Sequence, residues 1–168
     1  MINFSESQKF RQWWLWVILV VSIASATSLI CYAKVQNKDD MPAFAVVAGV
    51  LVPLLIIALF LFANLQTAID DIGVSVRFPP FRFKSKVIPW DEIANAWVRK
   101  YNPIGEFGGW GARYTFSRGT AYNVSGNMGL QLVLKDGKKM LIGSQQPDEL
   151  AAVLQRLNKV PGDPASSK

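Results

Sequence analysis

The chain contains no histidine and a single cysteine among its 168 residues. Without histidine, the Ser-His-Asp and Cys-His nucleophile systems, HExxH zinc sites and histidine proton shuttles are all excluded. Because Cys31 is alone, no disulfide can form within the chain, and we expect this residue to pack as a small apolar side chain. These absences, together with the lack of any other nucleophile arrangement, predict a protein that is not an enzyme and that holds no metal or cofactor.

Acidic residues are also few, with 12 Asp and Glu against 18 Lys and Arg, which gives a formal net charge of +6. The basic residues do not form a dense run of the type that binds nucleic acid, so nucleic acid is not a predicted partner. In membrane proteins, an excess of Lys and Arg commonly flanks the cytoplasmic ends of the spans. We favour this second interpretation of the charge.

Two long runs contain no charged residue at all, namely 13–33 and 43–65. Each run is long enough to cross a hydrocarbon core of about 30 Å as a helix. We therefore predict a cytoplasmic flank at 1–12, two transmembrane helices at 13–33 and 43–65, and a short external link at 34–42. The aromatic residues expected at the membrane interfaces are Trp13, Trp14, Trp16 and Tyr32. The candidate contacts to anionic lipid head groups are Lys9, Arg11, Arg82, Lys84 and Lys86.

The charges around these runs predict an orientation. Basic residues flank the outer ends of both runs, which favours cytoplasmic termini and a multi-pass protein of a bacterial inner membrane. A cleaved signal peptide ending near Ala26 is the alternative for the first run, although the apolar residues continue past that point. Pro53 is expected to kink the second helix. The lack of acids and bases inside the runs argues against an ion path.

The pattern changes at Leu65 from continuous apolar residues to alternation, which indicates β-strands. Turn residues such as Asp136-Gly137 separate the segments. Pro147 is expected to open a helix with an apolar face, and residues 161–168 are expected to be a disordered tail. The predicted strands lie at 65–69, 74–78, 81–89, 94–101, 113–116, 120–124, 130–134 and 139–142.

Two stretches carry a family resemblance: KVIPWDEIANAWVRKY (86–101) and GLQLVLKDGKKMLIGSQQPDELAAVL (129–154). They resemble the matching regions of bacterial membrane-anchored pleckstrin-homology-like (PH-like) domains. The resemblance implies an α+β membrane protein, in which a two-helix transmembrane hairpin precedes a PH-like seven-strand β-barrel or sandwich at 66–160, closed by a C-terminal α-helix. Lipid, peptide and subunit contacts are all proposed roles for such domains. The acidic turn at 70–73 departs from the basic loop of phosphoinositide-binding members and disfavours that mode of binding.

The glycine-rich stretch NPIGEFGGWG (102–111) is the most unusual part of this region. It suggests a contact loop that presents two aromatic rings, which are frequent at binding hot spots. The alternative is that both rings fold back over the open end of the barrel. The candidate partner-contact residues are Asn102, Phe107, Trp110 and Arg113.

These observations predict a membrane-anchored, non-enzymatic interaction module that docks a protein or peptide through the 102–113 loop or through an exposed strand edge. The alternative is a structural or accessory subunit of a membrane complex, with the helices making the contacts.

Overall fold

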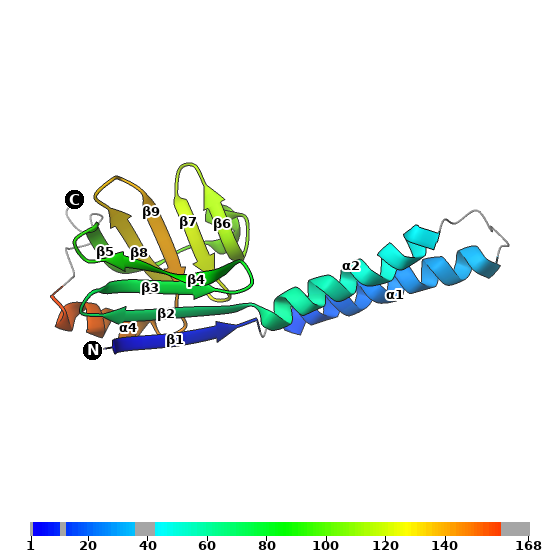
Figure 1. The fold of residues 1–168 in the computed structure, drawn as a ribbon, viewed down its shortest axis with the longest axis horizontal. Coiled ribbons are helices and arrows are strands. Elements are labelled where there is room, and N and C mark those ends of the chain that lie inside the picture. The colour runs from blue at the N-terminus through cyan, green and yellow to red at the C-terminus, as the bar shows by residue number, and fades with distance from the viewer. Residues whose placement is uncertain (1, 11–12, 36–42, 159–168) are drawn as a thin grey trace. The chain divides into compact units, whose positions relative to one another are not determined.

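A computed structural model describes residues 2–10, 13–35 and 43–158 of the chain (Figure 1). The chain divides into two compact units. The helical unit lies within Arg11–Phe62. The β unit combines the residues up to Phe10 with those from Ala63 onward.

The helical unit consists of α1 (Trp13–Val35) and α2 (Ala43–Phe62), which pack against each other. Gly49 on α2 lies against Ile30 on α1, where an added Cβ would come within 3.5 Å of the Ile30 Cδ1 atom. Large apolar side chains on both helices are exposed in the described residues. The hydroxyl groups of Ser22, Ser25 and Thr27 donate to the carbonyl groups four residues earlier, at 2.7, 2.7 and 2.8 Å.

The structure contradicts the predicted membrane spans. A spanning helix needs about 20 consecutive, predominantly apolar residues. Within the part of the chain that the structure describes, no helix supplies a stretch that is long and apolar enough. The predictions of a two-span integral membrane protein, of membrane as its partner and of a multi-pass inner-membrane location are therefore corrected.

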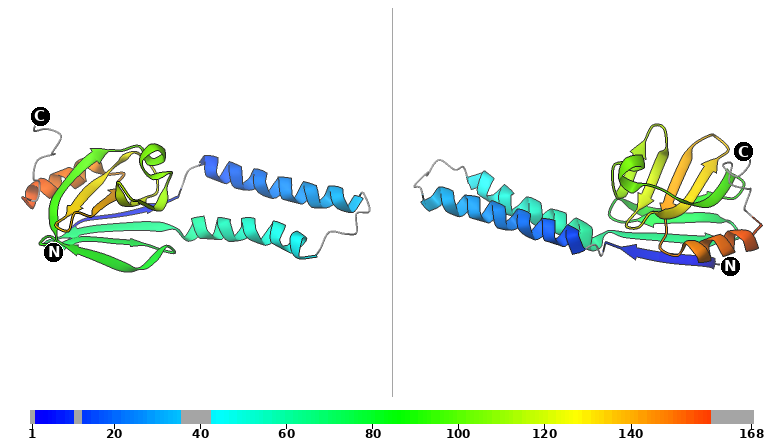
Figure 2. Two further views of the ribbon diagram at one scale, coloured as in Figure 1. Left: turned by 90° about the horizontal axis from the view of Figure 1, so that it is seen from above. Right: turned by 180° about the vertical axis from the view of Figure 1, so that it is seen from behind.

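The β unit contains two sheets, which Figure 2 shows from two further directions. The four-stranded sheet has the order β1-β2-β3-β4, with β1 (Ile2–Lys9), β2 (Asn64–Asp70), β3 (Gly73–Phe78) and β4 (Arg82–Pro89). The five-stranded sheet has the order β5-β8-β9-β7-β6, with β5 (Ile93–Lys100), β6 (Gly111–Thr115), β7 (Gly119–Asn123), β8 (Met128–Leu134) and β9 (Lys139–Gly143).

Strand β1 occupies the stretch that the sequence presented as a polar flank. It pairs antiparallel with β2, with Lys9 opposite Asn64. Its side chains alternate, because Phe4, Glu6 and Gln8 are buried while the residues between them are exposed. In the sequence, the helical unit is therefore inserted between β1 and β2, which are hydrogen-bonded neighbours in the sheet.

Polar contacts fix β1 to the end of β9, the central strand of the five-stranded sheet. The Glu6 carboxylate accepts hydrogen bonds from the Ser144 hydroxyl and the Gln145 backbone N–H, both at 2.7 Å. The Gln8 side-chain amide donates to the Gly143 carbonyl at 2.7 Å. A buried carboxylate needs such donors, because an unpaired one would be strongly destabilising.

Apolar side chains from both sheets fill the core, and helix α4 (Pro147–Arg156) packs against β1, β5 and β8. The predicted apolar face of this helix is confirmed, since Leu150, Val153 and Leu154 are buried. The largest fully buried side chain is Phe78. Its ring lies 6.5 Å from that of Phe10, 5.1 Å from that of Phe81 and 6.4 Å from that of Tyr122.

The predicted seven-strand PH-like barrel behind a transmembrane hairpin is wrong. The described residues form nine strands in two sheets, and the first strand comes from before the helices. Strand β7 also pairs with β9 in parallel, which places the β6–β7 hairpin at one end of the five-stranded sheet. Gly119 permits this close approach, because a Cβ there would collide with the backbone carbonyl of Lys139.

Candidate functional site

The predicted contact loop is largely a short helix, α3 (Pro103–Phe107), which ends at Gly108 in the left-handed conformation (φ 70°). Asn102 caps its start, because its side-chain oxygen accepts a hydrogen bond from the Gly105 N–H at 3.0 Å. In return, the Asn102 N–H donates to the Glu106 carboxylate at 2.9 Å. Asn102 therefore has a local structural role, and its side-chain oxygen is already engaged.

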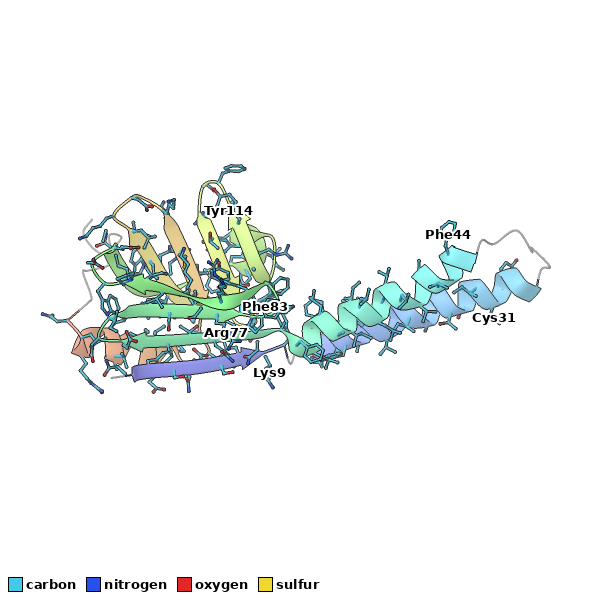
Figure 3. The ribbon with its side chains drawn as sticks, viewed as in Figure 1. Lys9, Cys31, Phe44, Arg77, Phe83 and Tyr114 are labelled. Atoms are coloured by element: carbon cyan, nitrogen blue, oxygen red, sulfur yellow. The ribbon has the colours of Figure 1, made fainter. Side chains whose placement is uncertain are left out.

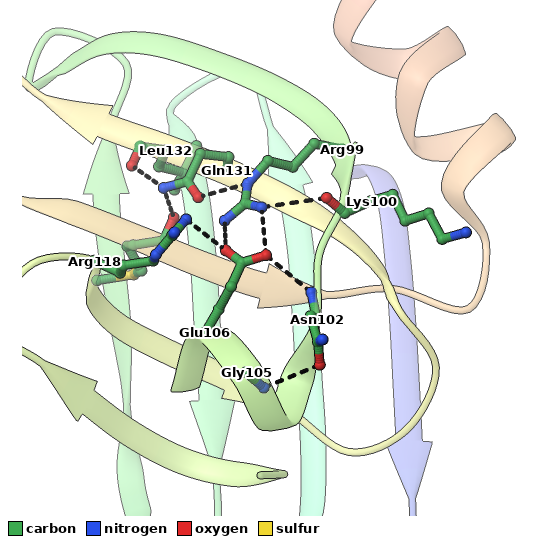
Figure 4. Close-up of polar contacts among 9 residues, drawn as sticks. Arg99, Lys100, Asn102, Gly105, Glu106, Arg118, Gln131 and Leu132 are labelled. Carbon is green, nitrogen blue, oxygen red and sulfur yellow. Dashed lines mark hydrogen bonds and ion pairs between the residues drawn. The ribbon is translucent and has the colours of Figure 1, made fainter. Parts of the chain in front are cut away.

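Glu106 is the centre of a polar cluster that holds α3 in place (Figure 4). Arg99 on β5 donates hydrogen bonds from two guanidinium nitrogens to this carboxylate, at 3.2 and 2.8 Å. It also donates to the Gln131 side chain at 3.1 Å. Arg118, in the turn between β6 and β7, reaches the same carboxylate at 3.0 Å. Hydrogen bonding from Arg99 lowers the pKa of Glu106 below its ordinary value. The cluster thus links the turn of the β6–β7 hairpin to β5 and β8, on the opposite side of the five-stranded sheet.

We expect Glu106→Gln to destabilise the β unit by about 1–3 kcal/mol, because it leaves the Arg99 guanidinium without its carboxylate. Urea unfolding at pH 7 measures the loss. The matched control is Glu92→Gln, an exposed position whose replacement should change the free energy of unfolding by no more than about 0.5 kcal/mol. Equal effects of the two substitutions would contradict this assignment.

The same pair of proteins predicts a pH dependence. Because the folded pKa of Glu106 lies below its ordinary value of 4.5, its contribution is complete above about pH 5 and is lost as the pH falls through the folded pKa. The stability difference between the natural chain and Glu106→Gln should therefore shrink on acidification. A difference that stays constant down to low pH would show that the carboxylate charge is not responsible.

The other three predicted contact residues do not form one surface. Phe107 is buried, and its ring meets that of Tyr101 edge to face at 6.2 Å. This buried environment raises the pKa of the Tyr101 hydroxyl. Trp110 is half-buried, while Arg113 is exposed and donates to the Trp110 carbonyl at 3.0 Å. For Phe107, the alternative that the ring folds inward is the one the structure shows.

Just beyond the predicted loop, Tyr114 lies on the β6–β7 hairpin (Figure 3), and Phe116 lies in the turn of the same hairpin. Tyr114 is 68% exposed and Phe116 is 96% exposed, and their rings meet edge to face at 5.6 Å. Next to them is an open depression of about 490 Å³. It is lined by Tyr114, Phe116, Ser117, Gly119, Thr120, Asp136, Gly137, Lys138 and Lys139.

The sequence pattern places Tyr114 and Phe116 only in a strand, so it does not predict this surface. A signal was nevertheless present, since Phe116 immediately precedes the turn residues Ser117-Arg118-Gly119. An aromatic residue beside a tight turn has few neighbours to cover it. We call Tyr114, Phe116 and the adjoining depression the aromatic surface.

The remaining predicted contacts are scattered. Lys9, Arg82 and Lys84 are exposed and Lys86 is half-buried, while Trp13 and Tyr32 are exposed and Trp16 is half-buried. Arg11 and the side chain of Trp14 lie outside the described residues. Their assigned lipid and interface roles depended on the membrane spans, and they lose that basis with the correction above.

Among the residues that the structure describes, no group of three or more Asp, Glu or Cys side chains is placed to hold a metal ion. The predicted acidic turn has a structural role, because the Asp70 carboxylate accepts from the Ile72 and Gly73 N–H groups, both at 2.9 Å. Comparison with family models, with curated proteins and with solved structures gives no match. Functional conclusions therefore rest on the geometry of this chain.

Proposed function

We propose that this chain is a non-enzymatic interaction module whose β unit docks an extended segment of a protein or peptide at the aromatic surface. The exposure of Phe116 carries the proposal. Leaving such a side chain in water forgoes about 1.5–3 kcal/mol of burial free energy. A bound segment that covers the ring recovers this free energy.

The strand beside these rings supports the same proposal. Strand β6 is the outer strand of the five-stranded sheet, where β7 is its hydrogen-bonded neighbour. Among the described residues no strand pairs with its other side, and the addition of a strand at such an edge is a common mode of peptide recognition. Tyr114 lies on β6 and Phe116 follows the strand in the turn, and their rings are in contact. An extended segment along β6 would therefore meet both rings at that end of the strand. The occupant we infer is an extended segment with a large apolar side chain that enters the depression.

The test is a selection of random peptides on the full chain, followed by affinity measurements on variants. We expect the double substitution Tyr114→Ser and Phe116→Ser to lower the affinity for the selected peptides at least tenfold, because aromatic side chains contribute most of the binding free energy in such contacts. Ile72→Ser is the matched control, since Ile72 is 69% exposed in the turn between β2 and β3. Selected peptides that bind the double variant as well as the natural chain would overturn the proposal.

A second candidate is an assembly subunit that makes its contacts through the helical unit. The exposed apolar side chains of α1 and α2 favour it, because large apolar patches are typical of interaction sites. Exchange of residues 11–62 for an unrelated helical hairpin separates the two candidates. Loss of assembly with retained peptide binding would favour the subunit, and the reverse would favour the module.

A further inference from the structure

All charged residues of the β3–β4 hairpin are basic. Residues 73–89 contain four cations, Arg77, Arg82, Lys84 and Lys86, and no acid. None of the four takes part in an ion pair among the described residues. Arg77 instead donates to the Phe83 carbonyl at 2.9 Å, which links the two strands.

Three of these cations share one face of β4. Arg82 lies opposite Phe78 and Lys86 lies opposite Val76, and both partners are buried on the inner face of the four-stranded sheet. The pairing of β4 with β3 shifts register between these two pairs. Lys84 lies two residues from both Arg82 and Lys86, so alternation along β4 places it on the face that they share. The opposite face carries Phe83 and Val87, which are 68% and 52% exposed.

Strand β4 is also an outer strand, with β3 as its hydrogen-bonded neighbour in the sheet. Residues 82–85 are exposed on both faces, so no described element covers them. Inward-facing cations on an outer strand disfavour pairing with a neutral or basic strand, because they would be desolvated or face like charge. The same cations would favour a strand that places a carboxylate opposite each of them.

From this geometry we propose that β4 pairs with an extended acidic segment of a partner protein. Asp or Glu residues at alternate positions of the segment face Arg82, Lys84 and Lys86. The apolar residues between them cover Phe83 and Val87. This basic edge lies on a different sheet from the aromatic surface, so it is a second and independent contact.

The probe is an acetylated hexapeptide of alternating glutamate and valine, titrated against the full chain. A peptide with the same composition but with three glutamates followed by three valines is its control. We expect the alternating peptide to bind at least tenfold more tightly than the block peptide. N-methylation of every second backbone amide on the pairing side should abolish binding, because the hydrogen bonds to β4 require those amides.

Charge reversal supplies the decisive variant. The triple substitution Arg82→Glu, Lys84→Glu and Lys86→Glu should lower the affinity for the alternating glutamate and valine peptide at least tenfold. The same variant should gain affinity for an alternating lysine and valine peptide. The matched control is Lys100→Glu, Arg113→Glu and Lys135→Glu. It changes the net charge equally at exposed positions on β5, on β6 and in the turn after β8. Its affinities for both peptides should stay within about threefold of those of the natural chain, because charges this far from β4 are largely screened by salt.

Three outcomes would overturn the proposal. They are equal affinity for the alternating and block peptides, equal losses in the two triple variants, and displacement of the peptide by a single-stranded oligonucleotide of the same charge. The Tyr114→Ser and Phe116→Ser variant should bind the alternating peptide with the affinity of the natural chain. Failure at the basic edge is therefore distinguishable from failure at the aromatic surface.

Discussion

A chain that lacks residues 2–10 is expected to lose the folded β unit. Residues 2–10 supply the buried rings of Phe4, on β1, and of Phe10, just after it, each worth about 1.5–3 kcal/mol on burial. It also supplies the Glu6 and Gln8 contacts to residues 143–145, and its loss would expose the neighbouring β2 edge. These contributions together rival the total stability of an ordinary domain, about 5–15 kcal/mol. Amide dispersion in NMR spectra and cooperative urea unfolding measure the result.

The matched control removes a much longer segment and should retain the fold. Lys9 lies opposite Asn64, so an Asn-Gly dipeptide in place of residues 11–62 would join Phe10 to Ala63 as a two-residue hairpin. The β unit of this shortened chain should unfold cooperatively, with dispersed amide signals. A folded β unit without residues 2–10, or an unfolded one in the Asn-Gly chain, would contradict the role that we assign to β1.

Phe78→Ala is expected to cost about 3–5 kcal/mol of stability, the usual loss for removing a fully buried ring. The ring of Phe78 is completely buried and faces three other aromatic rings, one of which belongs to β7 in the opposite sheet. The substitution therefore leaves a cavity where the two sheets meet. Urea unfolding of the full chain gives the change in free energy.

Phe83→Ala is the control for this substitution, because the Phe83 side chain is 68% exposed. Its replacement should change the free energy of unfolding by no more than about 0.5 kcal/mol. Phe78→Leu should fall between the two, since it retains most of the apolar volume. A loss below about 1 kcal/mol for Phe78→Ala would show that the surrounding rings collapse into the cavity.

Local pattern was sufficient to locate most elements of the β unit. The strands after Ala63 follow the alternation and turn residues that the sequence displays, and α4 follows its helical spacing. Strand β1 was not predicted, because its buried positions include Glu6 and Gln8 and these polar residues interrupt the apolar alternation. The groups that make these two residues acceptable in the core lie at 143–145, far along the chain.

The candidate site shows the same limit. The glycines at 105–111 indicated an irregular loop, whereas the Asn102 cap and the Glu106 cluster produce a short helix. Whether Phe107 or Phe116 is exposed depends on neighbours from other strands. Phe107 has Tyr101 beside it, while Phe116 lies in a turn beyond the covered part of the sheet. The aromatic surface was therefore not identifiable from local sequence.

The insertion of the helical unit between β1 and β2 has a consequence for synthesis. A ribosome makes β1 before the other strands of the β unit, but the hydrogen-bond donors to its buried Glu6 carboxylate follow 138 and 139 positions later, at Ser144 and Gln145. Strand pairing with such sequence separation closes a long loop, and its entropic cost slows assembly. The polar contacts of Glu6 on β1 can therefore form only after every other described strand of the β unit has been synthesised, although the pairing partner β2 is available much earlier.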